Sequence, residues 1–312
     1  MSLPRIAITI GDPAGIGPEI VYKALQDRGI FKLCRPAVIG SLAFAEKLGF
    51  DFKRYRCDLY DITGDFTEKL RPGKVTAASG EASYRYILKA VELVKNGAAD
   101  AIATAPISKE ALNAAGHDYS GHTELLAELT KTKDFAMLMA AGKFRAVMVT
   151  RHLPVSLISE NLTAGEIFKT ALLTSEFLKE KAGIKNPRVG VLALNPHAGE
   201  AGLLGKEEQL VIGPAVRKLF RKGINASGPL PADSAWQKNK NGAFDLLVAM
   251  YHDQAMIGLK ILSPENIVNV TLGLPFLRTS PGHGTAFDIA GRNKADPAPM
   301  IESIKFAAKY CQ

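Results

Sequence analysis

Short runs of β-branched and other apolar residues recur along the chain, and longer segments with helical periodicity lie between them. Strands are predicted over residues 6–10, 37–39, 101–105, 146–150, 188–194, 246–250 and 267–272. Helices are predicted over residues 17–28, 80–96, 164–182, 207–222 and 299–310, with Ser79 and Thr163 as candidate N-caps. Strands that alternate with helices indicate an α/β fold with a largely parallel sheet, buried on both faces.

The composition is that of a folded globular protein of one or two domains. The chain has 312 residues, of which 47% are apolar and 22% charged, so disordered, collagen-like and coiled-coil classes are excluded. Lysine and arginine exceed aspartate and glutamate by 39 − 31 = 8, which favours anionic partners. The basic stretches at residues 217–222 and 238–240 are interpreted as exposed helix and loop faces, and the single aromatic residue in them, Phe220, does not mark a nucleic-acid surface, so we expect no nucleic-acid partner.

Targeting and redox signals indicate a cytoplasmic protein. The three cysteines are widely spaced and form no Cys-x-x-Cys pair, which is typical of a reducing compartment. The longest apolar runs, such as residues 136–141 and 246–250, are far shorter than the roughly 20 residues of a membrane-spanning helix. No basic segment followed by an apolar core marks a signal peptide. We therefore expect no membrane partner.

Polar residues directly follow several predicted strands, where ligands gather in parallel α/β proteins. After the first strand comes a glycine-rich turn that contains Asp12 and lacks the third glycine of the G-x-G-x-x-G dinucleotide fingerprint. Its glycines are interpreted as structural, and the carboxylate is the better candidate for a polar role. Hydroxyl, lysine and imidazole groups at residues 104–110 and 121–124 could bind an anion at helix entrances. Taken singly, Ser108 and Thr123 are better explained as helix caps.

Three of the six histidines follow predicted strands: His152, His197 and His252. A lone histidine is more often a surface or core residue than a ligand, but three in the same topological position are harder to explain that way. Parallel strands would deliver all three imidazoles to one edge of a sheet, where they could bind Zn²⁺, Co²⁺, Fe²⁺ or Ni²⁺. From the residues alone, a metal site and three unrelated surface histidines both remain open.

A third polar group lies downstream and contains Lys260, Asn269, Arg278 and the run over residues 279–291. Its lysine and arginine could fix carboxylate or phosphate oxygens, arginine through a bidentate fork and lysine as a point charge. For either cation alone, a solvated surface position is the simpler interpretation.

Together these motifs resemble the 4-hydroxythreonine-4-phosphate dehydrogenases of pyridoxal phosphate biosynthesis. The resemblance covers nearly the whole chain, and its most specific parts are the Asn-Pro-His-Ala-Gly-Glu and Tyr-His-Asp-Gln blocks. The matching segments are residues 11–19, 104–109, 121–124, 195–200, 228–233, 251–254, 271–275 and 283–291.

The resemblance implies the isocitrate/isopropylmalate dehydrogenase type of fold, with two α/β/α domains around a cleft. It implies a discontinuous cofactor-side α/β domain formed by residues 1–117 and 262–312, and a central metal-binding and dimerisation domain formed by residues 118–261. It also implies a homodimer whose active site is shared between the two subunits.

The same resemblance implies roles for individual residues of this chain. A divalent metal, zinc, magnesium or cobalt, would be held by His152, His197 and His252. The substrate would be bound by His122, Thr123, Lys260, Asn269 and Arg278. The adenosine half of NAD or NADP would lie along the loop that contains His283, Gly284, Thr285 and Asp288.

The activity implied is metal- and NAD(P)-dependent oxidation, with decarboxylation, of 4-phosphooxy-L-threonine to 3-amino-2-oxopropyl phosphate. A metal bound to the secondary alcohol would lower the pKa of its hydroxyl and polarise the forming carbonyl while hydride leaves for the nicotinamide. The candidates for the proton acceptor are Asp253, Asp233 and a metal-bound water.

Departures from the family pattern leave the substrate open. Gly282 replaces a common aspartate, Gly202-Leu203-Leu204 replaces a frequent Gly-His-Met, and residues 255–258 differ from the usual Gly-Leu-Pro type.

Relatives act on other acids, such as threonate and erythronate 4-phosphates or diol carboxylates, so the same chemistry on another acid is the first alternative. The second is a metal-dependent hydrolase or lyase that uses the histidines without a nucleotide. A non-catalytic phosphometabolite sensor is not favoured, because no regulatory or DNA-binding segment is evident.

Overall fold

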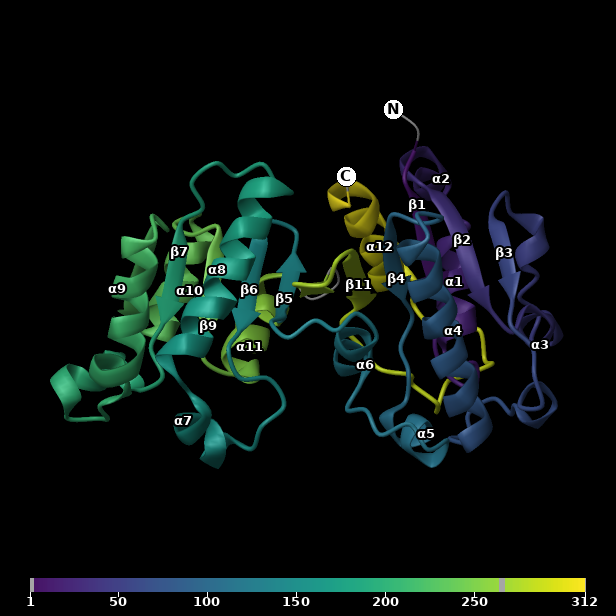
Figure 1. Cartoon of the computed structure of the whole chain (residues 1–312), viewed down its shortest axis with the longest axis horizontal. Coiled ribbons are helices and arrows are strands. Elements are labelled where there is room, and N and C mark those ends of the chain that lie inside the picture. The colour runs from purple at the N-terminus through teal and green to yellow at the C-terminus, as the bar shows by residue number, and fades with distance from the viewer. Residues whose placement is uncertain (1–2, 264–266, 312) are drawn as a thin grey trace. The chain divides into compact units, whose positions relative to one another are not determined.

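The chain forms two compact units, each with its own hydrophobic core (Figure 1). The computed structural model describes residues 3–263 and 267–311. Unit 1 consists of Met1–Lys133 and Leu274–Gln312, and unit 2 of Asp134–Gly273.

These bounds differ from the approximate divisions at 117/118 and 261/262 that the family resemblance implies. Helix α6 (His122–Leu129) belongs to unit 1 because its Leu125 and Leu126 are part of the buried core there. Strand β10 (Ile267–Leu272) belongs to unit 2 because it pairs with strand β5 (Ala136–Ala141). Both differences follow from packing and pairing partners that are distant in sequence.

The sheet of unit 1 is parallel. Its strand order is β3, β2, β1, β4, β11, and these strands span Asp58–Asp61, Arg35–Gly40, Arg5–Thr9, Ala101–Thr104 and Leu277–Pro281 respectively. Every neighbouring pair runs in the same direction. All residues of β4, and all but the first of β1, are buried, as expected for strands covered by helices on both faces.

Seven helices accompany this sheet in the described part of the chain. Besides α6 they are α1 (Gly17–Ala24), α2 (Arg28–Leu33), α3 (Leu42–Lys47), α4 (Ala77–Lys95), α5 (Lys109–Ala114) and α12 (Ala298–Tyr310), with 3₁₀ turns at Phe52–Arg54 and Thr67–Lys69. The long helix α4 packs on β1, β2 and β4, and α12 packs on β1, β4 and β11 together with α1 and α2. Figure 1 shows α4 lying along the strands.

The sheet of unit 2 is mixed. Its order is β10, β5, β6, β9, β7, β8, and the last four strands span Phe144–Met148, Leu246–Ala249, Val189–Leu192 and Ala226–Leu230. β5 is antiparallel to both β10 and β6. Its direction relative to β6 follows from the two-residue turn between them, which cannot provide the long crossover a parallel pair needs. The pairs β6–β9, β9–β7 and β7–β8 are parallel. Together with the parallel pairs of unit 1, seven of the nine strand pairs described within the two units are parallel, which confirms the expectation of a largely parallel sheet.

The helices of unit 2 are α7 (Ile158–Asn161), α8 (Ala164–Glu180), α9 (Gly213–Arg221), α10 (Ala232–Lys240) and α11 (His252–Leu262), with short turns at Val155–Leu157, Pro196–Gly202 and Glu208–Ile212. Helix α8 packs on β5, β6, β9 and β10 and contacts α9, while α11 packs on β5, β6 and β9 and contacts α10. Both helices thus cover β6 and β9, two of the three strands that precede the candidate ligands. None of the helices within the described residues combines the length and apolar character needed to cross a membrane.

All seven strands expected from the sequence are present, but β3, β5, β8 and β11 were not among them. β8 contains Gly228 and Pro229, residues that normally argue against a strand. A Cβ atom at Gly228 would lie 2.4 Å from the carbonyl oxygen of Val191, so the neighbouring strand itself requires the glycine. The composition of this segment therefore argues against a strand, whereas its close packing on β7 requires the glycine within one.

Two expected helix caps are confirmed and two are wrong. The hydroxyls of Thr163 and Ser108 each accept a hydrogen bond from the backbone N–H three residues on, at the starts of α8 and α5. Ser79 is not the N-cap of α4, because Thr76 caps the helix and Ser79 takes the third position of the capping box. Thr123 is not a cap either, since it is the second residue of α6.

Candidate functional site

Three histidines follow three neighbouring parallel strands of unit 2. β9 pairs in parallel with both β6 and β7. His252 begins α11 directly after β9, His152 follows β6 and His197 follows β7. Because the carboxyl ends of parallel neighbours lie at the same edge of a sheet, the strand pairing brings these three positions to one edge, which we call the histidine edge.

Two of these imidazoles lie next to each other. The ring centroids of His152 and His252 are 5.9 Å apart, with 42° between the ring planes. Asp253 Oδ1 lies 2.6 Å from His252 Nδ1. A carboxylate on one ring nitrogen orients an imidazole and leaves the other nitrogen for a metal. Asp253 is thereby placed as a partner of His252.

His197 opens a turn of left-handed backbone. The φ angles of residues 197–201 are 52°, 54°, 76°, 44° and 55°, a conformation that costs non-glycine residues energy and is seldom repeated along a chain. The buried carboxylate of Glu208 holds the start of this segment: its Oε1 accepts hydrogen bonds from the backbone N–H groups of Leu194 and Asn195, at 2.9 and 2.7 Å. A side chain eleven residues further on thus supports the conformation at His197.

Gln254 connects two of the strand ends, a role that sequence reasoning missed. Its Oε1 accepts a hydrogen bond from the backbone N–H of Met250 at 2.7 Å, and its Nε2 donates to the carbonyl oxygen of Ala193 at 2.6 Å. These two contacts join the end of β9 to the end of β7. The only available sequence signal was its place in the Tyr-His-Asp-Gln block.

The histidine edge offers suitable donors for a divalent metal without forming a complete ligand cluster. Imidazole nitrogens with a carboxylate in the second layer are a donor set typical of zinc and similar ions. In the residues that the structure describes, no three His, Cys, Asp or Glu side chains are close enough together to hold one ion. The chemistry of the donors fits a metal, and its ligand set stays a prediction.

The other expected residues of unit 2 lie around the sheet in different environments. Asp233 is exposed in the first turn of α10, after β8. Lys260 is exposed on α11, eight residues beyond His252, which is about 12 Å along a helix. Asn269 lies on β10, and among the described residues its buried Oδ1 has no hydrogen-bond partner. In the described part of the chain, no hydrogen bond or ion pair joins these three residues to the histidines.

In unit 1, Arg278 is a buried cation held by a threonine. It lies on β11 with 2% of its surface exposed, and its Nε and Nη2 donate to Thr104 Oγ1 at 3.1 and 2.7 Å. Burial lowers the pKa of Arg278 to about 9, so it is still charged at neutral pH, and the nearby Glu124 opposes the shift. Thr104 comes from the carboxyl end of β4, and its role as a partner of Arg278 was not foreseen.

His122 is the second polar group of this region. It is the first residue of α6, and among the described residues its buried Nε2 has no hydrogen-bond partner. Burial, with a smaller contribution from the charge of Arg278, holds the pKa of His122 well below its usual value, so the imidazole is neutral. Thr123 follows it and is buried. A neutral imidazole and a buried cation at one place suit an anionic ligand group.

The expected cofactor loop packs against the glycine-rich turn. The backbone N–H of Ile16 donates to the carbonyl oxygen of Thr285 at 3.0 Å. A Cβ atom at Gly15 would come within 2.8 Å of that same oxygen, so this glycine serves the close approach of two loops. His283, Gly284 and Asp288 are exposed. The cofactor contacts of this loop stay predictions.

Residues 32–307 of the chain match the family of the pyridoxal phosphate biosynthetic protein PdxA. The chain belongs to this family. It is 44% identical to a 4-hydroxythreonine-4-phosphate dehydrogenase of Desulforapulum autotrophicum, over 98% of the chain and 95% of the relative. It is 42% identical to a D-threonate 4-phosphate dehydrogenase of Cupriavidus necator, over 98% and 97%. A solved 4-hydroxythreonine-4-phosphate dehydrogenase of Klebsiella pneumoniae shares 39% identity and a TM-score of 0.89, over 99% of this chain and 100% of that one.

Membership of the PdxA family confirms the resemblance, the α/β fold class and the expectation of an oxidoreductase, since relatives that match nearly the whole chain are dehydrogenases. The alternative of a hydrolase or lyase without a nucleotide is therefore not retained. Two differently named groups of relatives match at similar identity, 44% and 42%. The comparison alone thus leaves the acid unassigned.

Asp12 leads to a prediction about pH dependence. It is buried, with Oδ1 accepting from the Ala14 N–H at 2.9 Å and Oδ2 accepting from Ser79 Oγ at 3.3 Å. Burial outweighs these hydrogen bonds and raises the pKa of Asp12 from 3.8 to about 6. A raised pKa means that the folded state holds this proton more tightly, so the protonated carboxyl contributes stability below about pH 4 that is lost as pH rises through about 6.

In the wild type we therefore expect Asp12 to lower the free energy of unfolding by about 1–3 kcal/mol between pH 4 and 7. In Asp12→Asn this contribution should be absent, because asparagine does not titrate. Urea unfolding at several pH values measures it. Asp118→Asn, at an exposed position, is the matched control and should leave the profile unchanged. Parallel profiles for the wild type and Asp12→Asn would contradict the assignment.

Proposed function

We propose that this chain is a metal- and NAD(P)-dependent dehydrogenase that oxidises and decarboxylates 4-phosphooxy-L-threonine to 3-amino-2-oxopropyl phosphate. The observation that carries the proposal is the histidine edge in a chain of the PdxA family: three imidazoles after three adjacent parallel strands. In the reaction the alcohol carbon gives up a hydride, its hydroxyl gives up a proton, and the carboxylate leaves as CO₂. The remaining carbon takes up a proton.

The residues of unit 2 suit the metal and proton chemistry. We infer that His152, His197 and His252 hold zinc, magnesium or cobalt. Bound there, the metal would polarise the substrate hydroxyl, and the nicotinamide would accept the hydride. Asp253, 2.6 Å from His252 Nδ1, orients that imidazole. This contact favours Asp233, exposed at the start of α10, as the proton acceptor.

The residues of unit 1 suit the anionic groups of the substrate and the cofactor. Arg278 supplies a positive charge whose position is fixed by its hydrogen bonds to Thr104. Neutral His122 and buried Thr123 supply hydrogen bonds. Lys260 and Asn269 of unit 2 are proposed as further substrate contacts. Loop 283–288, packed against the glycine-rich turn, is proposed for the adenosine half of NAD or NADP.

D-threonate 4-phosphate is the second candidate substrate. It differs from 4-phosphooxy-L-threonine in carrying a hydroxyl where the latter has its amino group, so both acids present the same phosphate, carboxylate and secondary alcohol. The observation that favours it is the 42% identity to a D-threonate 4-phosphate dehydrogenase, close to the 44% for the other activity.

A substrate panel tests the function. With Zn²⁺, Mg²⁺ or Co²⁺ and NAD or NADP, we expect absorbance at the wavelength of the reduced nicotinamide to rise with 4-phosphooxy-L-threonine. Its kcat/KM should exceed that for D-threonate 4-phosphate and erythronate 4-phosphate, and the unphosphorylated acids serve as controls for the phosphate. A reversed order between the two phosphorylated threo acids would favour the second candidate, and no reduction with any acid would contradict both.

The metal assignment predicts that His197→Ala removes most bound metal and lowers turnover by at least about a hundredfold, since one of three imidazoles is lost. Metal content after dialysis and kcat measure the two effects. His197→Asn is a second variant, because asparagine tolerates the left-handed backbone at this position. His117→Ala, at a histidine of unit 1 stacked on Tyr84, is the control. Full metal content in both His197 variants would exclude this residue as a ligand.

We also propose a cytoplasmic homodimer with a shared active site. Its support is the distribution of exposed apolar surface: of twelve large apolar side chains exposed in the described residues, nine belong to unit 2. The most exposed of them, Leu203, has 83% of its surface accessible. Apolar side chains gathered on one unit are typical of a surface that associates. The three free cysteines suit a reducing compartment.

Sedimentation velocity tests the dimer. We expect a species of twice the chain mass of 33.5 kDa, and a shift toward the monomer in Leu203→Glu, which would place a charge in the buried interface. Leu33→Glu, at an exposed leucine of unit 1, should not change the mass. A monomeric wild type at micromolar concentration would contradict the proposal.

A further inference from the structure

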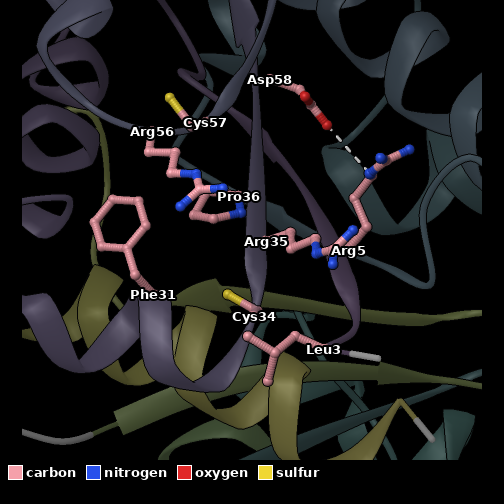
Figure 2. Close-up of a pocket in the computed structure, with 9 residues that line it drawn as sticks. All are labelled: Leu3, Arg5, Phe31, Cys34, Arg35, Pro36, Arg56, Cys57 and Asp58. Carbon is pink, nitrogen blue, oxygen red and sulfur yellow. Dashed lines mark ion pairs between the residues drawn. The ribbon is translucent and has the colours of Figure 1, made fainter. Parts of the chain in front are cut away.

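Unit 1 contains a cavity at the edge of the sheet opposite to the ends that carry the family motifs. It has a volume of about 600 Å³ and lies where β1, β2 and β3 begin, with Arg5, Arg35 and Asp58 as the first residues of those strands. A cavity of this size suits a small-molecule ligand. Figure 2 shows its lining residues, which also come from the end of α2 and from the segment before β3.

The charged lining of this cavity, which we call the arginine pocket, is positive. Three arginines and one aspartate give a formal charge of 3 − 1 = +2. Arg5 Nε pairs with Asp58 Oδ2 at 3.1 Å, and Arg5 Nη1 donates to the carbonyl oxygen of Ala98 at 3.1 Å. By contrast, the guanidinium groups of Arg35 and Arg56 make no hydrogen bond or ion pair with other described residues. Two arginines are thus available to a ligand.

The rest of the lining is apolar and uncharged. Phe31 lies on one side of the pocket in Figure 2 and the Arg5–Asp58 pair on the other. Burial raises the pKa of Cys34 to about 12 and that of Cys57 to about 11, so both thiols stay neutral and add no negative charge. The pocket therefore combines two available cations with a phenyl ring, which suits a flat group that carries an anion.

This pocket is separate from the positions assigned to the substrate in unit 1. Strand β1 has five residues, so its first and last Cα atoms lie about 13 Å apart. The glycine-rich turn follows its carboxyl end, and Arg5 stands at its amino end. Thr104, the partner of Arg278, likewise ends β4. A ligand in the arginine pocket would not compete for these groups.

We propose that the arginine pocket binds a small molecule with a phosphate group on a planar ring. Arg35 and Arg56 hold the phosphate oxygens, and the ring lies against Phe31. This site goes beyond the proposed dehydrogenase reaction, because it uses none of the residues assigned to metal, substrate or dinucleotide.

Isothermal titration calorimetry with phenyl phosphate tests the site without relying on activity. We expect binding to the wild type, at least tenfold weaker binding to Arg35→Ala and to Arg56→Ala, and loss in the double variant. Arg54→Ala is the matched control. It removes one positive charge at another exposed arginine of the same segment, but Arg54 pairs with Asp51 and lies outside the lining. Its affinity should equal that of the wild type. The dehydrogenase kcat/KM without phenyl phosphate should be the same in all four variants.

The contact between Phe31 and the ligand ring is tested by comparing phenyl phosphate with inorganic phosphate. Phe31→Leu should weaken phenyl phosphate at least threefold and leave the weaker binding of inorganic phosphate unchanged. Equal melting temperatures of the exposed arginine variants and the wild type show that the fold is retained. No binding of phenyl phosphate to the wild type at millimolar concentration overturns the proposal. Unchanged affinity and stoichiometry in the double variant also overturns it, because the phosphate then binds elsewhere.

Discussion

The parallel pairing of β9 with both β6 and β7 is the constraint on which the candidate metal site depends. Leu247 of β9 is level with Ala146 on one side and Gly190 on the other, so the three strands end close to one line. Any slip of register would move a histidine away from that line. Gln254 reinforces the alignment, because its amide ties Met250 to Ala193 beyond the last paired residues. A buried amide with both ends satisfied is costly to displace.

The candidate anion-binding groups of unit 1 are buried, and hydrogen bonds or nearby charges fix their position and protonation state. Arg278 retains its charge in a site where water is excluded, and the hydroxyl of Thr104 accepts two of its hydrogen bonds. His122 stays neutral in the same region because burial and that charge both disfavour its protonated form. A cation fixed in this way interacts with an anion more strongly than a solvated one does. The cost of burying such groups explains why each has a specific position in the fold.

The two edges of the unit 1 sheet differ in the way their polar groups are used. At the carboxyl edge, Asp12 and Thr104 are bound by neighbouring protein groups. At the amino edge, Arg5 is engaged by Asp58 and by the carbonyl oxygen of Ala98, while Arg35 and Arg56 are not engaged by described residues. The basic excess of the chain is therefore not a property of one site. Part of it lies at an edge that the family motifs do not mark.

The sequence by itself determined the α/β class, seven strands and the three histidine positions, because buried strands and the residues after them leave a local pattern of apolar and polar positions. It did not reveal β11, whose five residues include an arginine, a threonine and a serine, since only burial in the sheet makes that segment a strand. Nor did it reveal the antiparallel direction of β5, the boundaries of the two units, or the contacts of Thr104, Glu208 and Gln254. Those features join residues far apart along the chain, so only the tertiary structure decided them.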